Sequence, residues 1–508
     1  MTTARALALG MAAFAGVATV LGFAPFGFAH LPVVTLAVLF AQWNAAASRR
    51  DAAGLGFAFG LGLFGAGASW VYIALETFGG MPTAIALFAT AGFVAYLALW
   101  PAIAGYVAVR FTASHSITRV IAAASLWTLC EWLRGWLFTG MPWLSVGYAE
   151  LPGSMLARYA PIGGVYLVSF AVAVTAAMIA LIVDGLAHGQ CRRIAAFLAV
   201  CGALYAGGAA LARMEWTRPD GAPVAVSLIQ GNVLQDVKFD PEFRERTFEI
   251  YAGLVEQSRG KLIVLPESAY PMFSDEVPDS VLLQLARTAS KRGGDALLGL
   301  FTAEAPLPGT DEPRYFNTVV TLGSGELQLY RKRHLVPFGE TIPGKPVLGW
   351  FIRSVLAIPI ADQTPGDPEQ APFAVAGTRV AVNICYEDAF GRELIDGAQA
   401  ARILVNVTND AWYGHSIAAW QHNQMAAMRA LELGRPLLRA TNTGITSAIG
   451  HNGRIVSELP WFTRGVLDVD VQGRTGATPY QRIADWPALA LALVVAVVAC
   501  WRAPKRGH

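Results

Sequence analysis

Long apolar stretches constrain this 508-residue chain more than any other feature. Each stretch approaches the roughly 20 residues that a helix needs to cross the hydrocarbon core of a bilayer. Since 54% of the residues are apolar and only 15% are charged, we predict an α-helical membrane domain of eight spans. The first stretch follows Arg5 as in a signal peptide, but more spans follow directly, so we expect a retained anchor. The predicted spans lie near 6–23, 30–46, 53–76, 83–109, 117–138, 161–184, 194–213 and 486–501.

Basic residues between these stretches predict the orientation, because cytoplasmic loops accumulate Lys and Arg. In an eight-span arrangement, one side carries Arg5, Arg49, Arg50, Arg110, Arg119, Arg192, Arg193, Arg502, Lys505 and Arg506. We therefore expect both termini in the cytoplasm and the block 215–485 on the outer side, which is the periplasm of a double-membraned bacterium. The predicted domains are a membrane domain at 1–214, an outer domain at 215–480, an eighth transmembrane helix at 484–502 and a cytoplasmic tail at 503–508.

The sequence pattern of the outer block is typical of an α/β domain: short apolar runs between turn residues alternate with longer amphipathic segments. Predicted strands are 224–229, 262–265, 296–301, 316–322, 380–385, 403–407 and 437–440, and predicted helices are 241–258, 280–292 and 420–433.

Charge and cysteine content exclude several classes of function. A net charge of +2 without a basic cluster argues against nucleic-acid binding. The five cysteines show no pairing rhythm, and no His lies at metal-ligand spacing from a Cys or carboxylate, so we expect neither a disulfide framework nor a metal site. Cys385 is the one cysteine of the outer block, where an unpaired thiol risks oxidation.

Three reactive side chains stand at the ends of predicted strands: Glu267, Lys332 and Cys385. Sites in α/β folds form at strand ends. A carboxylate can take the proton of a thiol, the thiolate can attack a carbonyl, and an ammonium can stabilise the resulting oxyanion. Each residue alone is more often structural, as a buried cysteine or a solvated cap. Together they predict acyl chemistry through Cys385.

This trio resembles that of the nitrilase, or carbon-nitrogen hydrolase, superfamily, and its fusion to eight spans resembles the apolipoprotein N-acyltransferase family. The resemblance covers essentially the whole chain. It implies a nitrilase-like αββα sandwich in the periplasm, a multi-pass protein of the bacterial inner membrane and no cofactor. Its most specific segments are 131–143 (EWLRGWLFTGMPW), 330–340 (YRKRHLVPFGE), 384–388 (ICYED) and 406–414 (NVTNDAWYG).

The resemblance also implies roles for single residues. Glu267 is then the general base, Lys332 the oxyanion stabiliser and Cys385 the nucleophile. Glu340 is implied as an essential second carboxylate, with Tyr386 and Glu387 supporting the site. The chain departs from the family at Phe239, where a tryptophan is usual, so an aromatic contact is retained and an indole hydrogen bond is lost.

Further candidates come from their place next to the trio and from the membrane segments. Asn409 and Trp412 follow a predicted strand and are expected at the pocket rim, and Asn317 is expected to orient groups near Lys332. Glu131 and Arg134 stand three residues apart in the fifth span, where charge is often functional, although mutual pairing is the simpler interpretation.

An apolar patch at 343–358, with Trp350 and Phe351, suggests an arm that dips into the membrane interface and gates lipid entry. The alternative is an ordinary helix that packs on the outer domain.

The implied reaction is a two-step transfer through a Cys385 thioester. The donor is a glycerophospholipid, typically phosphatidylethanolamine, and the acceptor is the α-amine of the amino-terminal S-diacylglyceryl-cysteine of apolipoproteins. We expect a monomer. The first alternative is a membrane-tethered amidase or hydrolase in which water resolves the thioester. The second, a transporter with an outer binding module, is disfavoured by the few ionisable residues in the spans.

Overall fold

The computed structural model describes residues 3–306, 313–323, 325–342 and 362–501. The predicted arm at 343–358, with Trp350 and Phe351, and the tail at 503–508 lie outside the described residues. The chain divides into two compact units, each described by itself. The helical unit comprises Met1–Tyr72, Pro82–Glu215 and Arg482–His508, and the sandwich unit comprises Ile73–Met81 and Trp216–Gln481.

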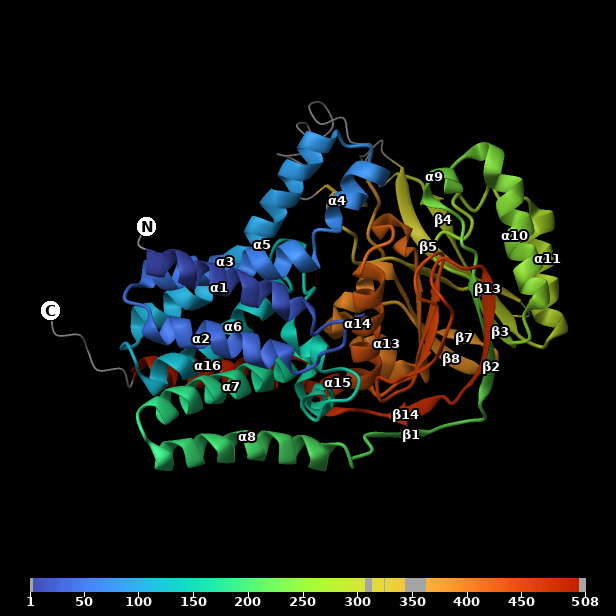
Figure 1. Cartoon of the computed structure of the whole chain (residues 1–508). Coiled ribbons are helices and arrows are strands. Elements are labelled where there is room, and N and C mark those ends of the chain that lie inside the picture. Colours follow the sequence, from blue (N-terminus) through green and yellow to red (C-terminus); the bar gives the residue numbers. More distant parts are fainter. Residues whose placement is uncertain (1–2, 307–312, 324, 343–361, 502–508) are drawn as a thin grey trace. The chain divides into compact units, whose positions relative to one another are not determined.

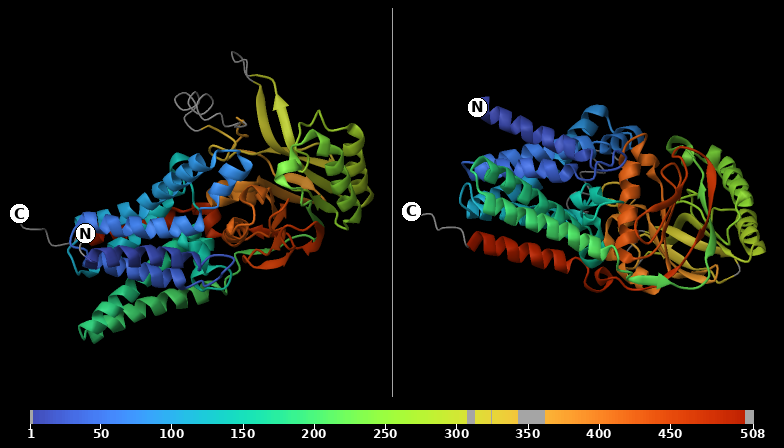
Figure 2. Two further views of the ribbon diagram at one scale, coloured as in Figure 1. Left: turned by 45° about the horizontal axis from the view of Figure 1, so that its top comes forward. Right: turned by 60° about the horizontal axis from the view of Figure 1, so that its bottom comes forward.

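The helical unit contains one helix at each predicted span, and the helices run side by side (Figure 2). They are α1 (Thr3–Val20), α2 (Leu31–Ala45), α3 (Arg49–Gly67), α5 (Thr83–Phe111), α6 (Ile117–Arg134), α7 (Ala160–Ala187), α8 (Cys191–Leu211) and α16 (Trp486–Trp501). Small residues allow close approach between them, as in other membrane helices. A side chain at Gly16 of α1 would stand 2.0 Å from the Phe59 carbonyl oxygen of α3.

Four helical segments of the described chain are long and apolar enough to cross a membrane: Thr3–Val20, Thr83–Phe111, Leu156–Ala187 and Cys191–Leu211. A fifth span results if Arg49–Gly67 and Val71–Phe78, bent by 56°, are counted as one. The helices α2 and α16 are apolar but shorter, and α6 carries the charges of Arg119, Glu131 and Arg134. The number of spans therefore stays a prediction beyond these four or five.

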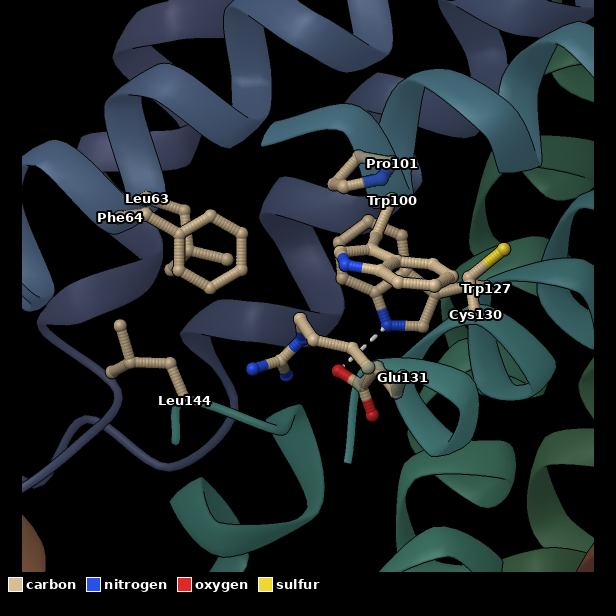
Figure 3. A pocket seen from close by; sticks show the side chains of 9 residues that line it. Leu63, Phe64, Trp100, Pro101, Trp127, Cys130, Glu131 and Leu144 are labelled. Carbon is tan, nitrogen blue, oxygen red and sulfur yellow. Dashed lines mark hydrogen bonds between the residues drawn. The ribbon is translucent and has the colours of Figure 1, made fainter. Parts of the chain in front are cut away.

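The charged residues near the end of α6 bind the loop that follows it. Figure 3 shows Glu131 hydrogen-bonded to Trp127 beside the cavity that they line. Glu131 Oε1 accepts hydrogen bonds from Trp127 Nε1 at 3.0 Å and from the Val146 N–H at 2.9 Å. Arg134 donates to the Trp143 carbonyl at 2.6 Å. The two side chains line a small cavity with apolar neighbours from α3 and α5. These contacts support a structural role for the pair.

The described residues of the sandwich unit form two six-stranded sheets and a two-stranded ribbon. Strands β2, β3 and β4 run parallel in one sheet, and β8, β9 and β10 run parallel in the other. The first sheet has the order β13 (Gly465–Val471), β2 (Val224–Gln230), β3 (Leu262–Val264), β4 (Asp295–Glu304), β5 (Arg314–Gly323), β6 (Leu329–Arg331). The second has the order β12 (Ile455–Glu458), β11 (Ser447–Ile449), β10 (Leu437–Thr441), β9 (Ile403–Thr408), β8 (Thr378–Ile384), β7 (Phe373–Val375). The ribbon pairs β1 (Thr217–Pro219) with β14 (Arg474–Gly476).

Helices cover the outer face of each sheet. Figure 1 shows α10 (Arg244–Gln257) and α11 (Asp279–Lys291) on the first sheet, and α13 (Ile395–Ala400) and α14 (Ala418–Leu433) on the second. The result is a four-layered α–β–β–α sandwich, and the predicted nitrilase-like architecture is confirmed.

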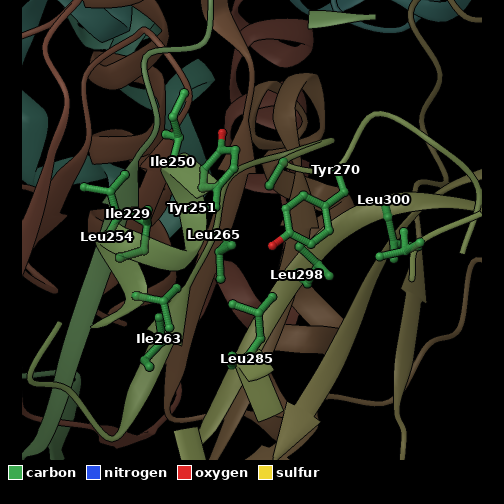
Figure 4. Packing of buried hydrophobic residues seen from close by; sticks show 14 of the residues in the cluster. Ile229, Ile250, Tyr251, Leu254, Ile263, Leu265, Tyr270, Leu285, Leu298 and Leu300 are labelled. Atoms are coloured by element: carbon green, nitrogen blue, oxygen red, sulfur yellow. The ribbon is translucent and has the colours of Figure 1, made fainter. Parts of the chain in front are cut away.

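One core cluster lies between the first sheet and its helices (Figure 4). In this cluster Leu254 of α10 lies beside Ile229 of β2, and Leu298 of β4 lies between Tyr270 and Leu285 of α11. Leu297, which lies between the cluster residues Ala296 and Leu298, is also fully buried, and because side chains alternate along a strand, it points towards the inside of the sandwich. Burial on both faces of β4 explains why its sequence is a continuous apolar run rather than an alternating one.

Candidate active site

Glu267 stands three residues beyond the end of β3, in a segment that lies close to β4. A side chain at Gly299 of β4 would stand 2.5 Å from the Pro266 carbonyl oxygen and 3.0 Å from the Glu267 Cα. Only a glycine leaves room for this backbone. Gly299 therefore helps to determine where the Glu267 carboxylate lies.

The Glu267 carboxylate is buried and accepts hydrogen bonds on both oxygens. Its Oε1 accepts from Asn317 Nδ2 at 2.7 Å and from Lys332 Nζ at 3.3 Å. Its Oε2 accepts from the backbone N–H of Asn409 at 2.9 Å. Three donors thus fix the orientation of one carboxylate, one from within β5 and two from just beyond the ends of β6 and β9.

Lys332 follows β6 directly and is 1% exposed. Its Nζ lies between two carboxylates, 3.3 Å from Glu267 and 2.7 Å from Glu340. Burial opposes its charge, but these two anions outweigh burial and hold the pKa of Lys332 well above its usual value. Lys332 is therefore a permanent cation. Glu340 is itself fixed, because its Oε2 accepts the Val336 N–H at 2.8 Å.

Cys385 begins a tight turn, the 3-10 segment η7 (Cys385–Ala389), immediately after β8. Its φ of 54° lies in the left-handed region, which costs a residue other than glycine about 1–3 kcal/mol. The thiol is buried, and burial together with the nearby Glu267 raises its pKa well above the usual range, while Lys332 acts in the opposite direction. The raised pKa favours the protonated thiol, and Glu267 lies near enough to contribute to that shift.

Glu387 joins the cysteine turn to the lysine segment. Its Oε2 accepts from the Ile384 N–H at 2.6 Å and from the Tyr330 hydroxyl at 3.0 Å. Its Oε1 accepts from the backbone N–H groups of Arg333 at 2.7 Å and His334 at 3.2 Å. Glu387 supports the backbone on both sides of the site.

Tyr386 is buried, and its ring lies edge-on to Phe390, with ring centroids 5.0 Å apart. The Phe390 ring in turn stacks on His334 at 3.7 Å. The aromatic rings therefore add a second contact between the cysteine turn and the segment that follows Lys332.

Asn409 and Trp412 both follow β9, but they play different parts. The Asn409 side chain is buried and binds Gln235 and Asn442 at 2.8 and 3.0 Å, which fixes the N–H that reaches Glu267. Trp412 is 40% exposed, and its ring lies edge-on to Phe78 at 6.2 Å. Phe239 is half-exposed.

Lys238 is a functional candidate that the sequence reasoning missed. It ends α9 (Gln235–Lys238), is 2% exposed and donates from Nζ to the Glu267 carbonyl oxygen at 3.2 Å. Burial lowers the pKa of Lys238 to about 8, although Glu267 and Cys385 act in the opposite direction. Its position next to Phe239 was the only signal in the sequence, since nothing else distinguishes a buried lysine from an exposed one.

The described residues contain no group of three or more His, Cys, Asp or Glu side chains that could hold a metal ion. The arrangement is instead one of a buried carboxylate, a buried cation and a buried thiol. These groups suit attack on an ester or amide carbonyl and storage of the acyl group on sulfur.

Comparison with known proteins gives matches over both units. Residues 15–178 match the apolipoprotein N-acyltransferase N-terminal domain, and residues 212–480 match the carbon-nitrogen hydrolase family. Apolipoprotein N-acyltransferase of Nitrosomonas europaea is 47% identical over 484 residues, which are 95% of each chain. The proteins of that name from Methylococcus capsulatus and Chromobacterium violaceum are 43% and 38% identical, over 94% and 98% of this chain and 92% and 94% of theirs.

Proposed function

Because the chain belongs to the apolipoprotein N-acyltransferase family, we propose that it moves a fatty acyl chain from a glycerophospholipid to apolipoproteins. The acceptor is the α-amine of their amino-terminal S-diacylglyceryl-cysteine. One observation carries the proposal: Glu267 and Lys332, which are 3.3 Å apart, both act on the charge of the Cys385 thiol.

In the first half-reaction Cys385 becomes acylated. The Glu267 carboxylate takes the thiol proton, and the thiolate forms a bond to the ester carbonyl carbon of the phospholipid. The carbonyl oxygen becomes an oxyanion beside the Lys332 ammonium. When the carbon–oxygen bond breaks, Glu267 returns its proton to the leaving alkoxide. A lysophospholipid departs and a thioester remains on Cys385.

In the second half-reaction the acceptor amine, in its neutral form, attacks the thioester carbonyl. A carbon–nitrogen bond forms and the carbon–sulfur bond breaks. Glu267 carries one amine proton to the departing thiolate, which restores the thiol and releases the amide. The same carboxylate therefore serves both steps, and the fixed cation Lys332 stabilises both oxyanions.

The proposed setting is the bacterial inner membrane, with eight spans, both termini in the cytoplasm and the sandwich unit in the periplasm. The concentration of Lys and Arg in the loops on one side of the eight-span arrangement supports this orientation. Phosphatidylethanolamine is the proposed donor, and the proposed state is a monomer. Two lipid-anchored substrates explain why a nitrilase-type domain is fused to apolar helices.

Mass spectrometry of the purified enzyme tests the reaction. Incubation with a phospholipid should add one fatty acyl mass to Cys385, and a diacylated lipopeptide should then remove it and gain the same mass. The Cys385→Ala variant, the control, should acquire no adduct. A persistent adduct on that variant would contradict the assignment of the nucleophile, and release of free fatty acid without acylated peptide would support the hydrolase alternative.

A further inference from the structure

Four charged side chains form a closed, fully buried ring behind the cysteine turn. His422 of α14 contacts Asp388 through Nε2 and Asp410 through Nδ1, each at 2.8 Å. Arg439 of β10 donates to the other oxygens of the same two carboxylates, at 2.8 Å to Asp388 and 3.0 Å to Asp410. All four side chains are at most 2% exposed. We call this group the charge ring.

The charge ring touches both segments that carry the proposed chemistry. Asp388 lies in η7, three residues after Cys385. Asp410 begins the 3-10 segment η9 (Asp410–Tyr413) and directly follows Asn409, whose N–H binds Glu267. The ring therefore links the turn of the nucleophile to the support of the general base.

A second connection runs through Asn406 of β9. Arg439 donates to Asn406 Oδ1 at 2.8 Å, and Asn406 Nδ2 donates to the Cys385 carbonyl oxygen at 3.1 Å. Because Cys385 has a positive φ, its backbone needs surrounding contacts to hold it in this conformation. Through Asn406, Arg439 therefore helps to hold the peptide group between Cys385 and Tyr386.

The geometry specifies the protonation state of His422. Both ring nitrogens face carboxylate oxygens, and each must donate a hydrogen to make its bond, so the ring is an imidazolium. Burial and Arg439 lower the pKa of His422, but Asp388 and Asp410 outweigh them and raise it. Burial opposes ionisation of Asp410, but Arg439 and His422 outweigh burial and lower the pKa of that carboxyl. The ring thus holds two anions and two cations.

The charged groups that face His422 are Asp388 of η7, Asp410 of η9 and Arg439 of β10. On α14 itself, Arg429 and Glu432 pair with each other at 2.9 Å. Asp410 raises the pKa of the Cys385 thiol, so any change in the balance of the ring is felt at the nucleophile.

We propose that His422 and Arg439 are positioning residues that hold the Cys385 turn in place and cancel the two buried carboxylates that would otherwise oppose the thiolate. This inference rests on Cys385 being the nucleophile of the proposed function. If the cluster were purely structural, its disruption would change the amount of folded protein. It would not shift the pKa of the Cys385 thiol up or down according to the sign of the charge that was removed.

The test measures the pH dependence of iodoacetamide alkylation of Cys385 in the full-length, detergent-solubilised protein, with the Cys385 peptide quantified by mass spectrometry. His422→Gln leaves a net charge of −1 in the ring, so the alkylation midpoint should rise by about one pH unit or more. Asp410→Asn leaves +1, so the midpoint should fall. In the double variant His422→Gln, Asp410→Asn the ring is neutral again, so the alkylation midpoint should return to within a few tenths of a pH unit of wild type.

Arg435→Gln is the matched control. Arg435 is a buried cation just beyond the end of α14, and it donates to the Ala401 carbonyl at 2.8 Å. Ala401 precedes β9, so this contact lies at the opposite end of that strand from the site. Replacement of Arg435 should lower the thermal midpoint without a change in the alkylation midpoint.

Acylation by phospholipid should slow about tenfold or more in His422→Gln, with KM within about twofold of wild type.

The proposal requires the alkylation midpoint to shift in opposite directions in His422→Gln and Asp410→Asn. Alkylation midpoints that move in the same direction in His422→Gln and Asp410→Asn, or that do not move at all, would overturn the proposal. If His422→Gln does not fold, the near-isosteric Asp388→Asn provides a second +1 variant, whose midpoint must fall as in Asp410→Asn. Alkylation needs no acyl substrate, so an inactive wild type with the expected midpoints would refute the proposed function and leave the role of the ring in setting thiol charge intact.

Discussion

At the scale of single residues, two buried lysines next to Glu267 behave differently because their partners differ. Lys332 lies between two carboxylates and keeps its proton. Within the described chain, the Lys238 ammonium makes a single hydrogen bond, to a backbone carbonyl, and burial lowers its pKa to about 8. One lysine is a fixed charge, and the other can lose its charge near neutral pH.

We expect the acylation rate with an amine-free phospholipid donor to fall as the pH rises through about 8. The protonated Lys238 favours the Cys385 thiolate, and this help disappears when the lysine loses its proton. In Lys238→Met the rate at pH 7 should be lower by about tenfold and the decline near pH 8 should be absent. Lys261→Met, which replaces an exposed lysine before β3, should retain the wild-type pH profile. An unchanged decline in Lys238→Met would assign this ionisation to another group.

Gly299→Ala should disturb Glu267 without touching any catalytic side chain. The added methyl group would stand 2.5 Å from the Pro266 carbonyl, so the backbone around Glu267 must move. We expect a loss of about 1–3 kcal/mol in unfolding free energy and a fall in the acylation rate of about tenfold or more. In α10, a methyl group added at Gly253 meets no atom within 4 Å, and Gly253→Ala should leave both quantities unchanged or raise stability slightly.

At the scale of elements, the turn η7 depends on contacts from a neighbouring segment rather than on its own sequence. Four donors converge on the Glu387 carboxylate, and three of them are backbone N–H groups. A glutamine amide can accept on one oxygen only, so Glu387→Gln leaves buried N–H groups without acceptors.

We expect Glu387→Gln to lower the free energy of unfolding by about 2–4 kcal/mol and to reduce acylation strongly, because both sides of the site lose their support. Tyr330→Phe removes one donor from the same carboxylate and should cost about 1 kcal/mol. Chemical denaturation of the two variants in one detergent measures the difference. Equal stabilities would show that the backbone N–H groups find other acceptors.

At the scale of the whole molecule, the proposed topology can be tested with a native residue. Cys191 is exposed and begins α8, next to Arg192 and Arg193, at the end of the helix that the distribution of Lys and Arg assigns to the cytoplasm. A membrane-impermeant maleimide should label Cys191 only after spheroplasts are lysed. A cysteine in place of the exposed Asp470 of β13 should be labelled before lysis. Labelling of Cys191 in intact spheroplasts would reverse the orientation.

Local sequence was sufficient to locate most elements of the sandwich and the three reactive side chains. The apolar runs at 262–265, 403–407 and 437–440 predicted β3, β9 and β10 closely, because burial on both faces requires continuous apolar strands. Glu267, Lys332 and Cys385 were identified because they end such runs and have complementary chemistry. The family resemblance then supplied their proposed roles and Glu340.

The convergence of these groups is a property of the tertiary structure alone. Glu267 and Lys332 follow strands of one sheet, whereas Cys385 and Asn409 follow strands of the other, so only the packing of two sheets brings their ends together. The charge ring joins η7, η9, α14 and β10, and its members are separated by up to 51 residues. No local pattern marks a buried lysine or a buried imidazolium, because burial is decided by distant segments. The apolar runs determined the elements, and their packing decided the site.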